Sequence, residues 1–305
     1  MKSLSQKTVV TLGVFDGVHR GHRQLLQKVI RRARKKNWIS LAYTFDPHPA
    51  ARVSPSASPL MLNTLAQRVD LIREQGIEKV FVQKFDRTFA QKTPREFFEQ
   101  ILLKTLNAGE IFVGYDFTFG VRRSGTTETL RELAQKSGIE LHVVSPILLG
   151  ETLVSSTQIR NYLAQGRLTE ATDLLQRSYF MEGTVMRGLG RGRKLSAPTA
   201  NLKSENDLIL PHGVYATWTW VQGKRWKSVT NIGHCPTFDS KSGTKRMSVE
   251  THLLDTQKNL YGQKIRIEFI RRIREEKRFN SPGELSDQIQ KDIALSRKIL
   301  LRKRS

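Results

Sequence analysis

Two histidines, His19 and His22, lie three residues apart around Gly21 in the stretch GVFDGVHRGH at residues 13–22. Their spacing matches none of the common zinc signatures, and the sequence identifies no nucleophile or carboxylate partner for proton transfer. Glycines at positions 13, 17 and 21 let the backbone approach a bulky anion, and the helix expected next offers its N-terminal amides to negative charge. The pattern favours a phosphate site in which imidazoles hydrogen-bond phosphate oxygens. The alternative is a pair of histidines without a chemical role.

The composition favours an anionic partner. Among 305 residues, Lys and Arg total 51 and Asp and Glu total 28, which gives a formal net charge of +23. Nucleotides, nucleic acid or acidic membrane surfaces fit such an excess, as does a generally basic surface without a partner. Cys235 is the only cysteine, which excludes an intrachain disulfide and fits a reducing compartment. Neither a membrane span nor a signal peptide is expected, so we predict a cytoplasmic protein.

The first half of the chain alternates strand and helix patterns. Four helices are expected. The first begins at about residue 22, the second contains Leu65, Val69 and Ile72, the third begins at the capping-box spacing of Thr93, and the fourth covers residues 127–138. Strands are expected over residues 8–12, 39–45, 79–85, 111–115 and 141–145. This order predicts a doubly wound parallel α/β sheet. Ligands bind beyond the carboxyl ends of such strands, which is where residues 13–22 lie.

The second half has short, partly alternating segments separated by turns, which predicts a small antiparallel β-barrel. One helix should close the chain. It begins at the capping-box spacing of Ser281, with Leu285, Ile289 and Ile293 on one face. The chain is therefore predicted to be α/β plus all-β, with domains at residues 1–176 and 177–305.

Several motifs together carry a family resemblance. The stretch at residues 13–22 resembles the signature of the HxGH nucleotidylyltransferases. It is followed in order by FDPHP (45–49), VGYDFTFG (113–120), SSTQIRNYLAQG (155–166), GRGRKLSAPTANL (190–202), NIGHCPTF (231–238), VETHLLD (249–255) and REEKRFNS (274–281). Over nearly its whole length the chain resembles the bacterial bifunctional riboflavin kinase/FMN adenylyltransferases.

For the first domain, the resemblance implies transfer of AMP from ATP to FMN, which gives FAD and pyrophosphate. It implies that His19 and His22 are catalytic. The implied ATP-binding residues are Gly13, Phe15, Asp16, Gly21, Ser155, Ser156, Thr157 and Arg160. The implied flavin pocket comprises Phe45, Pro47, His48, Asp116, Phe117 and Phe119. Without the resemblance, the serines and threonine would be a helix cap and the aromatic residues part of the core.

For the second domain, the resemblance implies phosphorylation of the ribityl 5′-hydroxyl of riboflavin by ATP with Mg²⁺. Glu250 matches the general base, although an outward-facing strand glutamate is the alternative. The implied ATP-binding residues are Gly192, Arg193, Lys194, Thr199 and Asn201, and the last two are also the implied Mg²⁺ ligands. Arg274, Glu275 and Phe279 match the flavin-pocket motif.

The chain departs from the family pattern at Ser196-Ala197, where the family usually has glycine and an aromatic residue. The departure motivates an alternative, an FMN adenylyltransferase with an impaired kinase domain. A basic RNA-binding or regulatory protein is a further alternative from a different class, although the basic residues are scattered and no RRM-type stacking motif is present. We expect small-molecule substrates and no specific nucleic-acid partner, and the sequence leaves the oligomeric state open.

Overall fold

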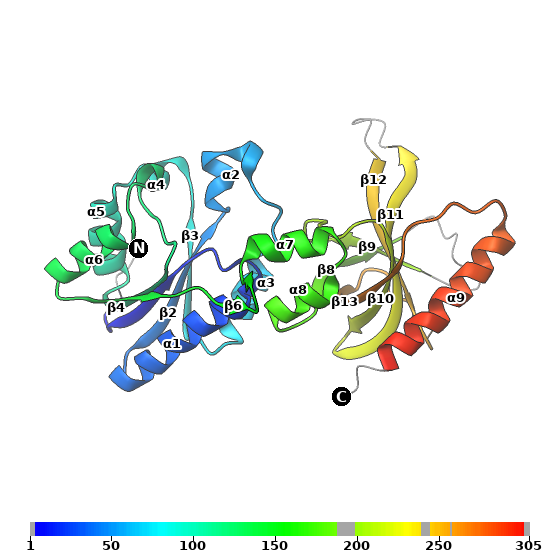
Figure 1. The fold of residues 1–305 in the computed structure, drawn as a ribbon, viewed down its shortest axis with the longest axis horizontal. Helices are drawn as coiled ribbons and strands as arrows, with labels where there is room; N and C mark the ends of the chain where they lie inside the picture. The colour runs from blue at the N-terminus through cyan, green and yellow to red at the C-terminus, as the bar shows by residue number, and fades with distance from the viewer. Residues whose placement is uncertain (1–3, 188–198, 239–244, 257, 302–305) are drawn as a thin grey trace. The chain divides into compact units, whose positions relative to one another are not determined.

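The computed structural model describes residues 4–187, 199–238, 245–256 and 258–301, with side chains described outside 234–247 (Figure 1). The chain divides into two compact units, Met1–Ser156 and Thr157–Ser305. The predicted domain boundary at residue 176 stays a prediction.

A five-stranded parallel sheet forms the first unit, which confirms the predicted fold. The strands are β1 (Thr8–Leu12), β2 (Ile39–Asp46), β3 (Lys79–Lys84), β4 (Ala108–Gly114) and β5 (Glu140–Val144). Their order is β3-β2-β1-β4-β5. Because the chain winds outward from β1 in one direction and later from β4 in the other, the switch point lies between these two strands, where α/β sheets bind ligands.

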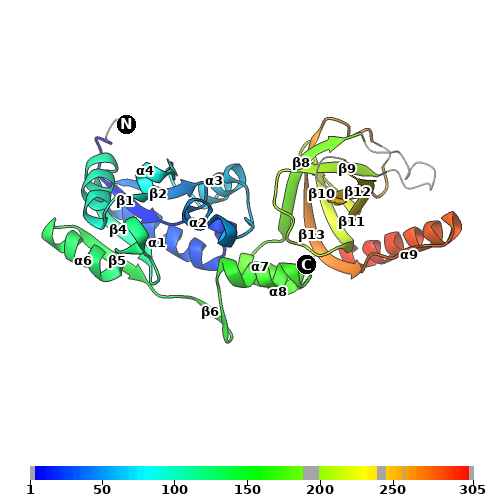
Figure 2. The ribbon, with the colours of Figure 1, turned by 90° about the horizontal axis from the view of Figure 1, so that it is seen from above.

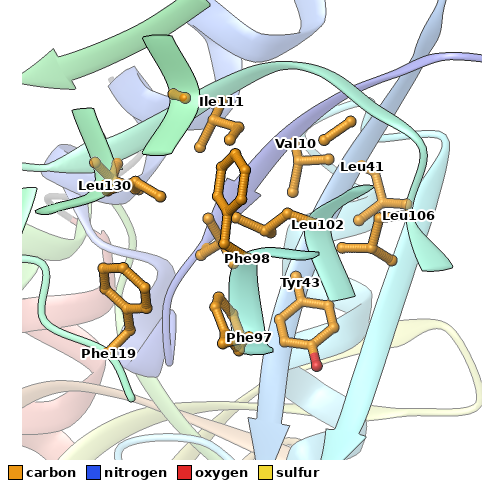
Figure 3. Close-up of a cluster of buried hydrophobic side chains, with 14 of the residues drawn as sticks. Val10, Leu41, Tyr43, Phe97, Phe98, Leu102, Leu106, Ile111, Phe119 and Leu130 are labelled. Atoms are coloured by element: carbon orange, nitrogen blue, oxygen red, sulfur yellow. The ribbon is translucent and has the colours of Figure 1, made fainter. Parts of the chain in front are cut away.

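Helices cover both faces of this sheet. Val10, Leu41 and Ile111 contact the helical segment Phe97–Thr105, whose Phe98 and Leu102 are buried (Figure 3). Alternate strand residues face the other side, where α1 (Arg20–Lys36) packs against β1, β2 and β4 and α3 (Leu65–Arg73) against β3. The remaining elements are η1 (Asp16–Val18), α2 (Pro49–Val53), η2 (Pro55–Ala57), α4 (Arg87–Ala90), α5 (Pro94–Glu96), η4 (Val121–Arg123), α6 (Thr127–Lys136), β6 (Leu148–Leu149) and β7 (Thr152–Leu153).

The second unit is the predicted antiparallel barrel, closed in the order β10-β11-β12-β9-β8-β13 (Figure 2). Its strands are β8 (Tyr179–Met186), β9 (Ala200–Ser204), β10 (Gly213–Val221), β11 (Lys224–Phe238), β12 (Lys245–Leu253) and β13 (Lys264–Arg274). Its helices are α7 (Ser156–Ala164), α8 (Leu168–Leu175) and α9 (Pro282–Leu301). The β10–β11 turn has positive φ at Gln222 and Gly223, as a tight hairpin requires.

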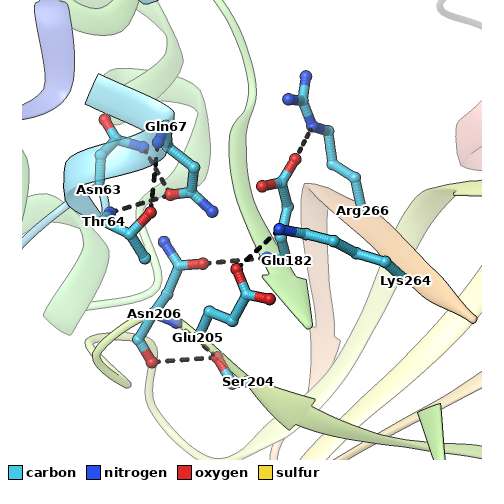
Figure 4. Close-up of polar contacts among 9 residues, drawn as sticks. All are labelled: Asn63, Thr64, Gln67, Glu182, Ser204, Glu205, Asn206, Lys264 and Arg266. Carbon is cyan, nitrogen blue, oxygen red and sulfur yellow. Dashed lines mark hydrogen bonds and ion pairs between the residues drawn. The ribbon is translucent and has the colours of Figure 1, made fainter. Parts of the chain in front are cut away.

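Polar contacts tie strand β8 to its neighbours in the barrel. Glu182 accepts a hydrogen bond from Arg266 of β13 at 2.6 Å, and its amide donates to Asn206 Oδ1 at 3.0 Å (Figure 4). Lys264 pairs with Glu205 at 2.9 Å. These contacts join β8, β13 and the residues after β9 at one side of the barrel.

The helix predicted through Leu65, Val69 and Ile72 is present as α3, and its buried face includes polar residues. Leu65 and Val69 are only half-buried, whereas Gln67, Arg68 and Leu71 are buried together with the expected Ile72. The capping box between Thr64 and Gln67 buries Gln67, and a hydrogen bond to the end of β2 holds Arg68 inside.

The buried face of α9 also includes polar residues, and its first turn begins at Ser281 as predicted, with the Glu284 amide donating to Ser281 Oγ. Leu285, Ile289 and Ile293 are half-buried, and the fully buried side chains are Asp292, Ser296 and Leu300. Asp292 accepts hydrogen bonds from Arg274 of β13, and Ser296 donates to the Ser228 carbonyl at 3.0 Å. Apolar periodicity is misleading here because polar residues find buried partners on the barrel.

Phe98→Ala should destabilise the first unit by about 3–5 kcal/mol, because it removes a fully buried ring and leaves a cavity against the sheet. Differential scanning calorimetry, with each thermal transition assigned to a unit, measures the loss. Leu60→Ala is the control, since Leu60 is 52% exposed and should change stability by less than about 0.5 kcal/mol. Equal effects of the two substitutions would contradict this core.

Candidate functional sites

The turn after β1 presents the histidine pair at the switch point of the sheet. Gly17 has φ +80°, a backbone conformation that favours glycine, and His19 is the extended N-cap residue of α1. A Cβ on Gly21 would lie 3.2 Å from the His19 ring, a tight contact that glycine avoids. The turn therefore places both imidazoles at the N-terminus of α1, where backbone amides and the helix dipole favour an anion.

The two imidazoles are stacked, with ring centroids 3.7 Å apart and planes inclined by 21°. The His22 amide donates to His19 Nδ1 at 3.4 Å, so a neutral His19 carries its proton on Nε2. Burial lowers the pKa of His22 well below its ordinary value, and the nearby His19 lowers it further. His22 is therefore neutral near neutral pH and acts as a hydrogen-bonding group, not as a fixed charge.

Asp16 holds this turn in place. Its carboxylate is buried and accepts hydrogen bonds from the amides of Leu62 and Asn63 at 3.1 and 3.2 Å, and its carbonyl accepts from Ser156 Oγ at 2.8 Å. The predicted ATP-binding residue thus connects the histidine turn to residues 62–63, just before α3, and to Ser156, the last residue of the first unit.

Phe45, Pro47 and His48 lie at the carboxyl end of β2, next to β1. The Asp46–Pro47 peptide is cis, and His48 is the N-cap of α2, where its Nδ1 accepts from the Ala50 amide at 3.1 Å. Like His19, a neutral His48 therefore carries its proton on Nε2. Sheet pairing brings this segment beside the histidine turn, since the amide of Gly13 donates to the Tyr43 carbonyl.

Aromatic rings connect the predicted flavin-pocket residues. Phe45 and Phe119 are both nearly buried and belong to one apolar cluster, and Phe117 packs parallel to Phe119 at 5.6 Å. Asp116 is exposed just after β4. Three further rings fill the space between Phe45 and Phe119: those of Phe85, Phe89 and Phe97, none of which the sequence pattern indicated. Contacting rings along this row have centroids 5.5–6.2 Å apart. The result is an apolar wall at the carboxyl ends of the strands.

The second predicted ATP motif lies at the division between the two units. Ser155 and Ser156 belong to the first unit, where Ser156 contacts Asp16 and Val154 lies beside Gly21. Thr157 is exposed and Arg160 half-buried on α7 in the second unit. The structure thus brings Ser156 to the histidine turn.

A cluster of oxygen ligands forms on the barrel at β9 and β12. Glu250 lies directly opposite Asn201 in the antiparallel register, and Thr199 Oγ1 donates to Glu250 Oε2 at 3.4 Å. All three side chains are half-buried. Hydroxyl, amide and carboxylate oxygens are the ligands that a hard divalent cation prefers, so the donor set fits Mg²⁺. The predicted Gly192, Arg193 and Lys194 lie outside the described residues, as do Ser196 and Ala197.

The predicted flavin-pocket residues of the barrel lie at and after the end of β13. Arg274 makes a bidentate ion pair with the buried Asp292 of α9 and lies 5.8 Å from the Phe279 ring, which is half-buried. Glu275 is 81% exposed and lies 3.6 Å from Arg272. Arg274 therefore anchors α9, which places the Phe279 segment next to the barrel.

Two charged groups were missed by the sequence analysis. The first is the buried Arg68, whose position inside α3 no apolar pattern indicates. The second is the group of Glu110, Glu140 and His142, which Arg32 bridges at 2.5 and 2.7 Å. Burial raises the pKa of Glu110, but hydrogen bonds from Arg32 and His142 outweigh this effect and hold the pKa below its ordinary value. The group is an ion-pair network that links α1 to β4 and β5.

Among the described residues, no helix has both the length and the apolar character needed to cross a membrane.

Comparisons with known proteins identify relatives of both units. The family model described as FAD synthetase matches residues 1–158, and the model described as riboflavin kinase matches residues 175–300. The Bifunctional riboflavin kinase/FMN adenylyltransferase of Bacillus subtilis is 36% identical over 295 residues, covering 96% of this chain and 92% of the relative. The protein of the same name from Escherichia coli K12 is 35% identical, covering 93% and 90%.

A solved structure, described as a macrolide-efflux protein from Streptococcus pneumoniae, has the same fold. It aligns with a TM-score of 0.85 and 29% identity, and covers 97% of this chain and 95% of its own.

The His22 imidazole should stay neutral down to a pH well below 6.5, because burial and the neighbouring His19 both disfavour its cationic form. Since the unfolded chain takes up this proton near pH 6.5, the first unit should lose stability as the pH falls below that value. NMR titration of the histidine Cε1–H resonances, with His22→Gln identifying the signal, measures it. An apparent pKa of 6.5 or above would contradict the buried environment.

Proposed function

Because the chain belongs to the family of bifunctional riboflavin kinase/FMN adenylyltransferases, we propose that its two side-chain clusters carry the two reactions of that family. The protein phosphorylates riboflavin to FMN and transfers AMP from ATP to FMN, which gives FAD. The assignment of residues to each reaction is the proposal. It rests above all on the stacked His19–His22 pair at the switch point of the sheet.

In the first reaction site, the FMN phosphate attacks the α-phosphorus of ATP and pyrophosphate leaves. This exchange needs positioning and stabilisation of phosphate charge, with no protein nucleophile. His19 and His22 donate hydrogen bonds to phosphate oxygens, and the amides at the start of α1 add favourable dipoles. Residues 13–21 shape the ATP site. The family resemblance supports further ATP-binding roles for Ser155, Ser156, Thr157 and Arg160, whose hydroxyl and guanidinium groups suit phosphate oxygens.

The flavin is proposed to bind against the apolar wall beside this site. The half-buried Phe117 supplies aromatic surface for a flat ring system, supported from behind by the buried rings of Phe45 and Phe119. Pro47, His48 and Asp116 complete the pocket at the carboxyl ends of β2 and β4. The pairing of β1 with β2 supports a flavin site next to the phosphate site.

In the kinase site, Glu250 accepts the proton of the riboflavin 5′-hydroxyl as that oxygen attacks the γ-phosphorus of ATP and ADP leaves. Thr199 and Asn201 would hold Mg²⁺, which neutralises phosphate charge when bound. The contact between Thr199 and Glu250 supports a shared role for these residues. Arg193, Lys194 and Gly192 are proposed to bind ATP, and Arg274, Glu275 and Phe279 to border the flavin.

The two activities are proposed to divide at residue 176, with domains 1–176 and 177–305. The left-handed Gln176 that ends α8 and the match of the riboflavin kinase model from residue 175 support this boundary. Riboflavin, FMN and ATP are the small-molecule partners, and the lack of a specific nucleic-acid partner stays a prediction. A reducing cytoplasm that supplies ATP is the proposed compartment, supported by the single cysteine.

His19→Ala should lower FAD formation from FMN by roughly 10²–10³-fold and leave riboflavin phosphorylation intact, because only one site loses a donor to phosphate. Glu250→Gln should do the reverse, with a loss of roughly 10²–10⁴-fold, because the amide cannot accept the hydroxyl proton. Chromatography of parallel incubations with ATP and Mg²⁺, one starting from riboflavin and one from FMN, measures both. Each variant controls for the other, and a folded variant that loses both reactions would contradict two separate sites.

Thr199→Val should raise the Mg²⁺ concentration needed for half-maximal riboflavin phosphorylation about tenfold, because one oxygen ligand becomes a methyl group. The Mg²⁺ dependence of FAD formation from FMN should not change. A Mg²⁺ titration of both reactions, with Thr199→Ser as the variant that retains the hydroxyl, measures the effect. An unchanged Mg²⁺ requirement in Thr199→Val would contradict this ligand.

A further inference from the structure

Arg68 is the largest fully buried side chain in the described part of the chain, with 2% of its surface exposed. It lies one residue after Gln67, which closes the capping box of α3 with Thr64 (Figure 4). A guanidinium keeps its positive charge in proteins, and a buried charge is unfavourable unless nearby groups compensate it. The surroundings of Arg68 must therefore explain its position.

Arg68 is poorly satisfied by hydrogen bonds. Its Nη2 donates to the Phe45 carbonyl at 2.8 Å, whereas Nε and Nη1 are buried and find no acceptor among the described residues. Burial lowers the pKa of Arg68, and the negative charges of Asp16 and Asp46 raise it. The geometry places two acids near this charge: Asp46 directly follows the carbonyl that Nη2 binds, and Asp16 accepts the amides of Leu62 and Asn63, just before the Thr64 N-cap of α3.

Both acids belong to segments that form this site. Asp16 lies in the turn that leads to His19, and Asp46 begins the cis peptide that leads to Pro47 and His48. The carbonyl that Arg68 holds, that of Phe45, ends the buried part of β2. Arg68 therefore binds the end of the flavin-pocket strand and belongs to the helix whose leading segment holds Asp16.

The charge balance points to a role in the reaction. Two anionic substrates, ATP and FMN, must meet at the carboxyl ends of β1 and β2, and Asp16 and Asp46 would repel them there. A buried cation acts through a medium of low dielectric constant, where its field is weakly screened. Arg68 is placed to offset both carboxylates without lying in the solvent-exposed part of the site.

We propose that Arg68 is a positioning residue of the adenylyl-transfer reaction: it neutralises Asp16 and Asp46 and fixes the end of β2, so that anionic substrates bind beside the histidine pair. This inference rests on the proposed function of that site. It differs from a purely structural role, in which α3 is merely fastened to β2, because the charge and not only the hydrogen bond is required.

The test is a set of four variants assayed for FAD formation from FMN: Arg68→Lys, Arg68→Met, Asp46→Asn and the double variant Arg68→Met/Asp46→Asn. Arg68→Met removes the charge and should lower kcat/KM for ATP about tenfold or more, chiefly through KM. Arg68→Lys keeps the charge and should stay within about threefold of the parent. Because Asp46→Asn leaves no charge at that position to be compensated, the kcat/KM of the double variant should be at least about threefold higher than that of Arg68→Met.

Riboflavin phosphorylation by the same preparations should stay unchanged, which controls for active protein, and the thermal transition of the first unit reports its folding. Equal losses in Arg68→Lys and Arg68→Met, with no recovery in the double variant, would overturn the inference in favour of a fastening role. If Arg68→Met removes the thermal transition, Arg68→Lys decides: a KM for ATP near that of the parent supports the role of charge, and a raised KM contradicts it.

A parent protein that converts FMN to FAD while the variants behave alike would refute this inference alone. A parent protein that makes no FAD from FMN would instead refute the proposed function of the site.

Discussion

The buried carboxylate of Asp16 is the constraint on which the first site depends. Its two oxygens accept the amides of Leu62 and Asn63, and its carbonyl accepts the hydroxyl of Ser156. Two segments far apart in the sequence, residues 62–63 and Ser156, are thereby fixed against the turn that carries His19. A carboxylate with buried amide donors is held rigidly, so the turn that carries the proposed phosphate site is already ordered by contacts within the protein. The same negative charge explains why a compensating cation is buried nearby.

The site also uses the same side chains for structure and for chemistry. His19 and His48 are both helix N-caps that accept a backbone amide through Nδ1. Each cap stabilises its helix and at the same time fixes the neutral tautomer with Nε2 protonated. A histidine that accepts through one nitrogen can offer only a donor at the other. Capping thus selects the hydrogen-bonding form that phosphate or flavin oxygens require.

The sequence predicted those features that depend on local chemistry or simple periodicity. Strand patterns indicate the parallel sheet and the barrel. Short-range hydrogen bonds explain why the capping box at Thr93 and the cap at Ser281 could be predicted. Strand β9 could not be predicted from its own residues, because ANLKS has little strand character and is held by its neighbours β8 and β12. Arg68 and Asp292 were missed because their burial depends on partners distant in sequence, which no helical period encodes. The meeting of Thr199 with Glu250 was anticipated only through the family resemblance.

The barrel interior shows how a polar core can still position a reactive group. Five fully buried hydroxyls satisfy one another at 2.7–3.4 Å, from residues Thr217, Thr219, Ser228, Thr230 and Thr251. Because strand residues alternate faces, the inward Thr251 forces Glu250 outward, beside Asn201. A slip of one residue would bury the carboxylate among hydroxyls and expose Thr251, leaving its partners unsatisfied. The buried hydroxyl network therefore helps to fix the register that places Glu250 beside Asn201.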